Sequence, residues 1–191
     1  LAVEATPPPR AALLPHIWLS DEEIRQGQRL LEQLPDKAGT PPIALHPYAT
    51  HPDKAWKEAY WRQLMELFES RGIPWIVIGR GNGMEGIPAS RNFTNRTSLR
   101  ETCALLKSSS LLITGDSGPM HLAGAVGTPV LALFGPTTEE WGFFPAGPKD
   151  RVLESQLDCR PCTLHGKKHC DRNHACMQSI TPEQVMRALD E

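Results

Sequence analysis

The chain has 191 residues, 40% of them hydrophobic and 22% charged, and a formal net charge of −2. This length allows one domain with a full apolar core, and the composition is ordinary for a globular protein. The near-neutral charge gives no electrostatic case for binding nucleic acid or an anionic membrane, and no apolar run approaches the roughly 20 residues of a membrane-spanning helix.

The N-terminal end is expected to be a linker. Residues 1–18 are rich in Pro, and the run Thr6-Pro7-Pro8-Pro9 favours extended backbone over regular structure. No basic stretch followed by an apolar one marks a signal peptide. Because the chain begins with Leu1 rather than Met, we expect it to be a piece of a longer protein.

Helix caps and apolar runs then predict helices that alternate with strands. Ser20 and Glu23 form a capping box that opens a first helix, which should end near residue 34, before Pro35. The apolar runs that follow are short, as in buried strands. The remaining predicted elements are a strand at 43–45, a helix at 57–71, a strand at 75–78, a helix at 98–107, strands at 111–114 and 130–134 with a short helix between them, a strand at 151–153 and a helix from 182.

This order predicts an α/β fold. Strands separated by helices form an open parallel sheet with helices on both faces. We place the domain at residues 19–191, including an irregular Cys-rich segment at 156–179.

The most informative motif is the turn Asp116-Ser117-Gly118-Pro119-Met120-His121, which follows one apolar run and opens a short helix. Ligands of open parallel sheets bind just beyond the carboxyl ends of the strands, where this turn should lie. It offers a carboxylate, a hydroxyl, backbone made accessible by Gly118, and a helix N-terminus with free N–H groups. The turn therefore suits an anion or a sugar.

Two further loops follow predicted strands. The first carries Thr50 and Lys54, a hydroxyl and an ammonium that can hold a diphosphate, although a solvated lysine in a surface loop is the plain alternative. The second, at 79–85, is rich in Gly but lacks the G-x-G-x-x-G spacing, and Glu85 closes it. Ser98 is expected to cap the helix that comes next.

The ordered set Asp116, Ser117, Gly118 and His121, then Gly127-Thr128-Pro129 and Phe134-Gly135-Pro136-Thr137, closely resembles the C-terminal half of glycosyltransferase family 9. These are the ADP-heptose:lipopolysaccharide heptosyltransferases. The resemblance covers roughly residues 20–191. It implies one Rossmann-like half of a GT-B fold, the half that binds the donor.

The resemblance also implies roles for individual residues. Thr50 and Lys54 would contact the donor phosphates. Glu85 would accept from ribose hydroxyls, unless it is simply an exposed Glu, and the backbone of Thr97-Ser98-Leu99 would line the adenine pocket. In the main motif, Asp116 would accept from sugar hydroxyls or cap the helix. The rest of the turn would bind phosphate, namely Ser117, Gly118, Pro119, Met120 and His121. For His121, a purely structural hydrogen bond is the alternative.

The implied enzyme transfers heptose from ADP-heptose to the lipopolysaccharide inner core with inversion and needs no cofactor for transfer. Its base is an Asp of the N-terminal acceptor half, which this chain lacks, so we expect no catalytic residue here and nucleotide binding without turnover. The expected location is cytoplasmic, with peripheral attachment to the inner membrane as an option. Two alternatives stay open: a non-catalytic nucleotide-sugar-binding module, and a GT-B transferase that uses a UDP- or GDP-sugar.

Four cysteines form a second candidate site. Cys159, Cys162, Cys170 and Cys176 open with a C-x-x-C spacing, which is typical of a structural Zn site and is also compatible with Fe. Interleaved His165, His169 and His174 could replace one cysteine. Disulfides and free thiols are the alternatives. Cys103 is expected in the core.

Overall fold

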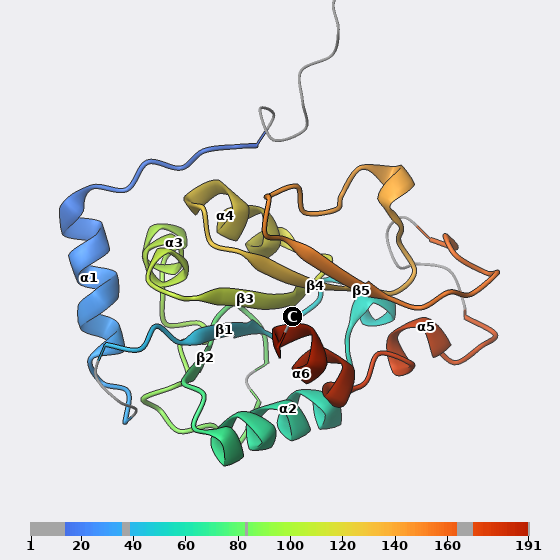
Figure 1. Cartoon of the computed structure of the whole chain (residues 1–191), viewed down its shortest axis with the longest axis horizontal. Helices are drawn as coiled ribbons and strands as arrows, with labels where there is room; N and C mark the ends of the chain where they lie inside the picture. Colours follow the sequence, from blue (N-terminus) through green and yellow to red (C-terminus); the bar gives the residue numbers. More distant parts are fainter. Residues whose placement is uncertain (1–13, 36–38, 83, 164–169, 191) are drawn as a thin grey trace, which may run out of the picture.

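The computed structural model of the chain describes residues 14–35, 39–82, 84–163 and 170–190. Its centre is one parallel sheet of five strands in the order β2-β1-β3-β4-β5 (Figure 1). The strands are β1 (Ile43–His46), β2 (Trp75–Val77), β3 (Leu111–Gly115), β4 (Val130–Phe134) and β5 (Arg151–Glu154). The predicted α/β class with an open parallel sheet is confirmed.

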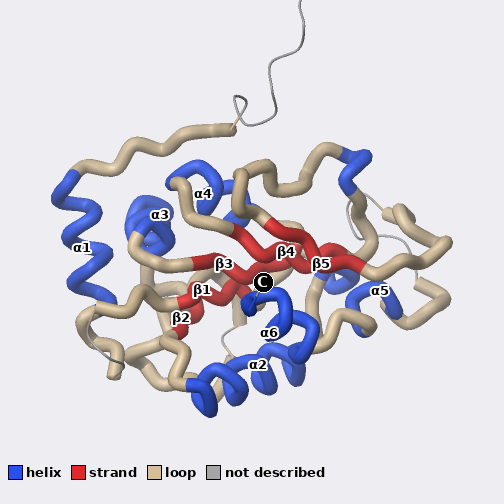
Figure 2. The backbone as a smooth tube through the Cα atoms, in the orientation of Figure 1, coloured by secondary structure: helices blue, strands red, loops and turns tan. Residues whose placement is uncertain are grey.

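Helices cover both faces of this sheet (Figure 2). On one face lie α3 (Leu99–Lys107) and α4 (Gly118–Val126), with α1 (Asp21–Leu31) packed against α3. On the other face lie α2 (Glu58–Arg71) and α6 (Pro182–Asp190). Three short helical pieces sit in loops: η2 (Pro52–Lys54), η3 (Glu139–Trp141) and α5 (Ala175–Gln178).

The strands supply two apolar cores because successive side chains of a strand point to opposite faces. In β1, Ile43 and Leu45 belong to the cluster beneath α2 and α6, whereas Ala44 belongs to the cluster beneath α3 and α4. Burial on both faces explains why the strands read as continuous apolar runs in the sequence.

Local sequence signals set most of the boundaries. Both predicted capping boxes are present, with Ser20 and Ser98 each accepting from the backbone three residues on. The first helix ends at Leu31 rather than near residue 34. The pieces η2, η3 and α5 were not predicted, because three or four residues are too few to show a helical period.

Residues 14–18, within the predicted linker, have no helix or strand but lie on the domain. The backbone N–H of Ile17 donates to the carbonyl of Ala125 in α4 at 2.9 Å. The Pro-rich run falls outside the described residues. Within the described ranges, no helix combines the length and apolar character needed to cross a bilayer.

Candidate functional site

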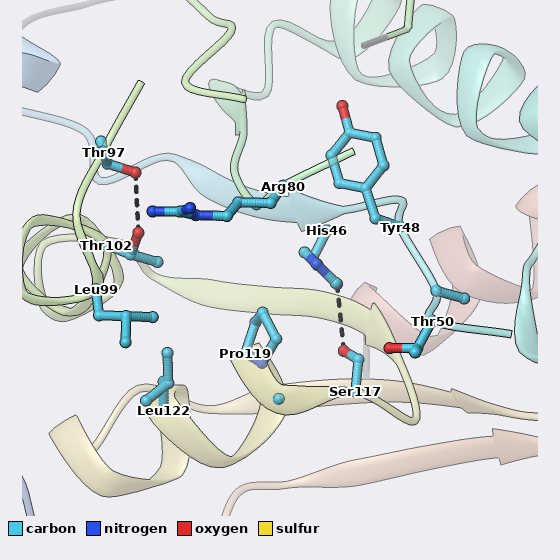
Figure 3. Close-up of a pocket in the computed structure, with 13 residues that line it drawn as sticks. His46, Tyr48, Thr50, Arg80, Thr97, Leu99, Thr102, Ser117, Pro119 and Leu122 are labelled. Carbon is cyan, nitrogen blue, oxygen red and sulfur yellow. Dashed lines mark hydrogen bonds between the residues drawn. The ribbon is translucent and has the colours of Figure 1, made fainter. Parts of the chain in front are cut away.

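The strand order places a crevice between the ends of β1 and β3. The chain leaves β1 toward β2 on one side, then returns to build β3, β4 and β5 on the other. In open α/β sheets, such a switch in direction leaves a gap beyond the carboxyl ends of the two strands, and ligands bind there. A cavity of about 410 Å³ lies at this point (Figure 3). Its lining residues are His46, Tyr48, Ala49, Thr50, Gly79, Arg80, Thr97, Leu99, Thr102, Ser117, Gly118, Pro119 and Leu122.

His46, the last residue of β1, joins the two strand ends. Its Nδ1 lies 3.0 Å from the hydroxyl of Thr114 and 3.2 Å from that of Ser117, at the N-terminus of α4. The two hydroxyls also lie 2.8 Å from each other. The residue is 6% exposed, and burial lowers the pKa of His46 to about 4. His46 is therefore a neutral hydrogen-bonding group near pH 7.

The loop after β2 closes over this ring and needs a glycine to do so. Gly79 has a φ of +120°, and a Cβ there would fall 2.5 Å from Cδ2 of His46 and 2.9 Å from Cδ2 of Tyr48. Tyr48 in turn shares a hydrogen bond of 2.7 Å with the hydroxyl of Thr94. A side chain at position 79 would push both rings out of place.

The far end of the cavity combines apolar and polar side chains. Leu99 and Leu122 contribute aliphatic groups, and Leu99 is 69% exposed. Beside Leu99, the hydroxyls of Thr97 and Thr102 share a hydrogen bond of 2.9 Å, and the guanidinium of Arg80 points toward this pair (Figure 3). Apolar side chains next to hydrogen-bonding groups suit a flat heterocycle with polar edges.

An ion pair lies next to the cavity, beside Ser117. Nζ of Lys54 is 2.5 Å from Oδ2 of Asp116, and the two side chains are 13% and 10% exposed. The same carboxylate oxygen accepts from the hydroxyl of Thr137 at 3.0 Å. Asp116 is not the helix cap that one reading of the sequence allowed, because the N-cap position of α4 belongs to Ser117.

Half of the predicted binding residues line the cavity itself. The six that do are Thr50, Thr97, Leu99, Ser117, Gly118 and Pro119. Lys54 and Asp116 form the adjoining ion pair instead. The remaining four, Glu85, Ser98, Met120 and His121, lie elsewhere in the described structure.

Each of those four has a position that explains its absence from the cavity. Met120 is buried in the core beneath α3 and α4, and Ser98 caps α3. Glu85 is exposed, and its backbone carbonyl accepts a hydrogen bond from Arg62. His121 is also exposed and lines a separate hollow with Phe144.

Several residues in or beside the cavity had no predicted role. His46 could have been found, since a histidine that ends a buried strand is a polar group at the binding edge of the sheet. Thr137 lies in the Gly135-Pro136-Thr137 run, but nothing local indicates that its hydroxyl reaches Asp116. Tyr48, Arg80, Thr102 and Leu122 join the site only through the fold and leave no pattern in the sequence.

Within the described residues no disulfide joins the four clustered cysteines, and Cys103 lies in the core, also outside any disulfide. Burial is the main cause that raises the pKa of the Cys176 thiol. The parts of the chain that the structure describes contain no group of three or more His, Cys, Asp or Glu side chains arranged to hold a metal ion. His165 and His169 lie outside the described residues.

Comparison with known proteins gives a consistent result. The sequence model of glycosyltransferase family 9 (heptosyltransferase) matches residues 15–171. Lipopolysaccharide heptosyltransferase 1 of Pseudomonas aeruginosa is 35% identical over 153 residues, which is 73% of this chain and 40% of that protein.

Two solved structures share the fold. The E. coli ADP-heptose LPS heptosyltransferase II has a TM-score of 0.71 at 22% identity, over 93% of this chain and 53% of that one. The iron-containing dodecameric glycosyltransferase TibC of E. coli, also solved with ADP-D-beta-D-heptose, has a TM-score of 0.65 at 23% identity, over 82% of this chain and 46% of that one. The chain thus spans about half the length of the curated relatives that it matches.

Proposed function

The chain belongs to glycosyltransferase family 9, the heptosyltransferases, and on that basis we propose that it is the C-terminal, donor-binding half of such an enzyme. The observation that carries the proposal is the cavity at the switch point of the sheet, with the Lys54–Asp116 pair beside it. Binding at a switch point is the general mode of nucleotide recognition by open α/β sheets.

The two ends of the cavity suit the two ends of a nucleoside diphosphate. The base would lie at the end that carries Leu99 and Leu122, with Thr97 and Arg80 at its edge. The phosphates would lie at the ends of β1 and β3. There Thr50 and Ser117 offer hydroxyls, the start of α4 offers backbone N–H groups, and Lys54 supplies positive charge.

The neutral ring of His46 contributes by holding the hydroxyl of Ser117 in place. Because this imidazole is buried and uncharged near pH 7, it adds no charge to the phosphate site, and Lys54 supplies positive charge beside the ends of β1 and β3. Asp116 would keep Lys54 in position before the donor arrives and offers its second oxygen to donor hydroxyls.

The donor that best fits this family is an ADP-heptose, and the acceptor would be the lipopolysaccharide core. TibC has been solved with ADP-D-beta-D-heptose, which agrees with an adenine nucleotide here. Guanine presents N–H donors along its edge, and the described cavity-lining residues include no carboxylate to accept them.

Transfer itself would require a second half that brings the acceptor and the inverting general base. Catalysis depends on holding both reactants in one geometry, so this chain alone should bind nucleotide without turnover. The complete enzyme would act in the cytoplasm, at the inner membrane where its acceptor lies. Two alternative functions compete with this proposal: a non-catalytic nucleotide-sugar-binding module, and a transferase that uses UDP- or GDP-sugars.

Calorimetric titration of the purified chain with ADP, UDP and GDP tests the proposal. We expect ADP to bind best, and Lys54→Ala to weaken that binding. Arg172→Ala, which alters an exposed ion pair with Asp158, is the matched control. Preference for UDP or GDP would overturn the assignment of the donor. Failure of a folded chain to bind any of the three would overturn the donor-half proposal, and heptose transfer by this chain alone would refute the need for a second half.

A further inference from the structure

Lys54 is held by a short turn that receives support from the Cys-rich segment. Its backbone lies at the end of η2, where its N–H donates to the carbonyl of His51 at 3.0 Å. A lysine side chain has four flexible carbons, so its ammonium is well placed only if the backbone beneath it is fixed. Three contacts come to this region from residues more than 100 positions later in the chain.

The contact closest to Lys54 is made by its neighbour in sequence. Oδ1 of Asp53 lies 2.7 Å from Nε2 of His174. Farther along the loop, the indole N–H of Trp56 donates to the carbonyl of Ile180 at 2.8 Å, and Lys57 donates to Gln178 at 2.8 Å. The segment around α5 is thus hydrogen-bonded to the loop that carries Lys54.

The orientation of His174 is itself fixed. Its φ is +54°, in the left-handed region that an L-residue with a bulky side chain rarely adopts. Its backbone N–H donates to Sγ of Cys170 at 3.2 Å. A neutral ring with its proton on Nε2 donates to Asp53 as a charged ring does, so this contact does not depend on protonation of the histidine.

The hydrogen bond between Asp53 and His174 is partly shielded from water. Asp53 is 17% exposed and His174 38% exposed, so the carboxylate side of the pair is largely removed from water. On the opposite side, the loop abuts β3, because a Cβ at Gly115 would fall 3.3 Å from the carbonyl oxygen of Lys54. The loop is therefore clamped between β3 and the segment that carries His174.

We propose that His174 is a positioning residue for the donor phosphates: through Asp53 it fixes the turn that presents Lys54 to them. The inference rests on the proposed function, since it assumes that Lys54 meets phosphate. It gives the Cys-rich segment a role in donor binding that needs no metal and no direct contact with the donor.

The test compares ligands with and without phosphates. Affinities for ADP and adenosine are measured on the whole chain and on His174→Asn and Asp53→Asn. Asparagine tolerates the left-handed backbone at position 174 but is too short to make the same contact. We expect each variant to weaken ADP by at least about threefold and to leave adenosine unchanged, and His174→Asn to add nothing in a Lys54→Ala background.

A purely structural role predicts a different pattern, in which ADP and adenosine weaken together and the effects of His174→Asn and Lys54→Ala add. That pattern would overturn the inference, as would unchanged ADP binding in both variants. In either case ADP binding by the parent chain would still stand, so the two proposals fail separately. Arg172→Ala, two residues away and in an exposed ion pair, should match the parent chain throughout.

A measurement without ligand keeps the inference testable if ADP fails to bind. The acylation rate of the Lys54 amine by an amine-reactive ester is followed by mass spectrometry. His174→Asn should raise this rate by at least about threefold, because a loosened turn uncovers a lysine side chain that is now 13% exposed. An unchanged rate would show that His174 does not hold the turn that carries Lys54.

Discussion

The ammonium of Lys54 lies 2.5 Å from the carboxylate of Asp116, 62 residues later in the chain. The pair links the loop after β1 to the loop after β3, and the hydroxyl of Thr137 ties it to the loop after β4. Three loops at the carboxyl edge of the sheet thus share one carboxylate. A phosphate that enters here meets a lysine already drawn into place, a preorganised arrangement that lowers the cost of binding.

The pair should show strong coupling in a double-mutant cycle. Because both side chains are mostly buried, Lys54→Ala or Asp116→Ala alone should lower the free energy of unfolding by about 2–4 kcal/mol, since each leaves a shielded charge without its partner. The double variant should lose clearly less than the sum. Urea unfolding of all four proteins measures this, and additive losses would show that the pair is not energetically coupled.

Removal of the Thr137 hydroxyl should be costly because its side chain is fully buried. Thr137→Val keeps the shape but leaves Asp116 without one donor, and we expect a loss of about 1.5–3 kcal/mol, as for a hydrogen bond to a charged group. Thr137→Ser should recover most of this. Thr138→Val removes a neighbouring hydroxyl that contacts Glu140 near the surface, and it should change stability little. Equal losses at positions 137 and 138 would argue against the special role of Thr137.

Stability should depend on pH through His46. Burial lowers the pKa of His46 from 6.5 to about 4, so between these values the unfolded chain binds a proton that the folded protein excludes. The free energy of unfolding should therefore be highest above about pH 6.5. It should fall as the pH is lowered toward 4, by about 3 kcal/mol in total, because protonation favours the unfolded chain.

Urea unfolding at pH 7, 6 and 5 checks this expectation. His46→Gln should flatten the decline over this range, apart from its own fixed cost. His16→Gln controls for the loss of an exposed histidine. If the parent chain and His46→Gln decline in parallel, burial of the ring is not the source of the pH dependence.

Two glycines in helices should respond to alanine in opposite ways. A Cβ at Gly27 in α1 would fall 2.7 Å from the carbonyl carbon of Ala104 in α3, so Gly27→Ala should cost about 1–3 kcal/mol by forcing the helices apart. At Gly124 in α4 no atom of the described residues lies within 4 Å of an added Cβ, and Gly124→Ala should gain about 0.5–1 kcal/mol from better helix propensity. Thermal unfolding of the two variants tests the difference in sign.

Cysteine labelling distinguishes a metal-free Cys-rich segment from one that binds a metal ion. In the native chain, the half-buried Cys159, Cys162 and Cys170 should react with a thiol reagent well before Cys103 and Cys176, whose pKa values are raised chiefly by burial. Mass spectrometry of labelled peptides gives the rates. Protection of all four clustered cysteines until a chelator is added would instead reveal a bound Zn or Fe.

The sequence by itself determined the order of elements, the parallel sheet and the importance of the turn at 116–118. Capping boxes at Ser20 and Ser98 and the apolar runs of the strands are local signals, because a cap or a strand face depends on residues a few positions apart. They predicted the helices and strands that support the site. They also placed Asp116 and Ser117 at the edge of the sheet where ligands bind.

The tertiary structure alone decided which side chains meet at that edge. The contacts of His46 with Ser117, of Lys54 with Asp116 and of Asp53 with His174 join residues that are 62 to 121 positions apart in the chain. Such contacts depend on which strands are neighbours and on how the loops close over them, and no local preference encodes either. The same dependence brought Arg80 into the cavity and left His121 outside it.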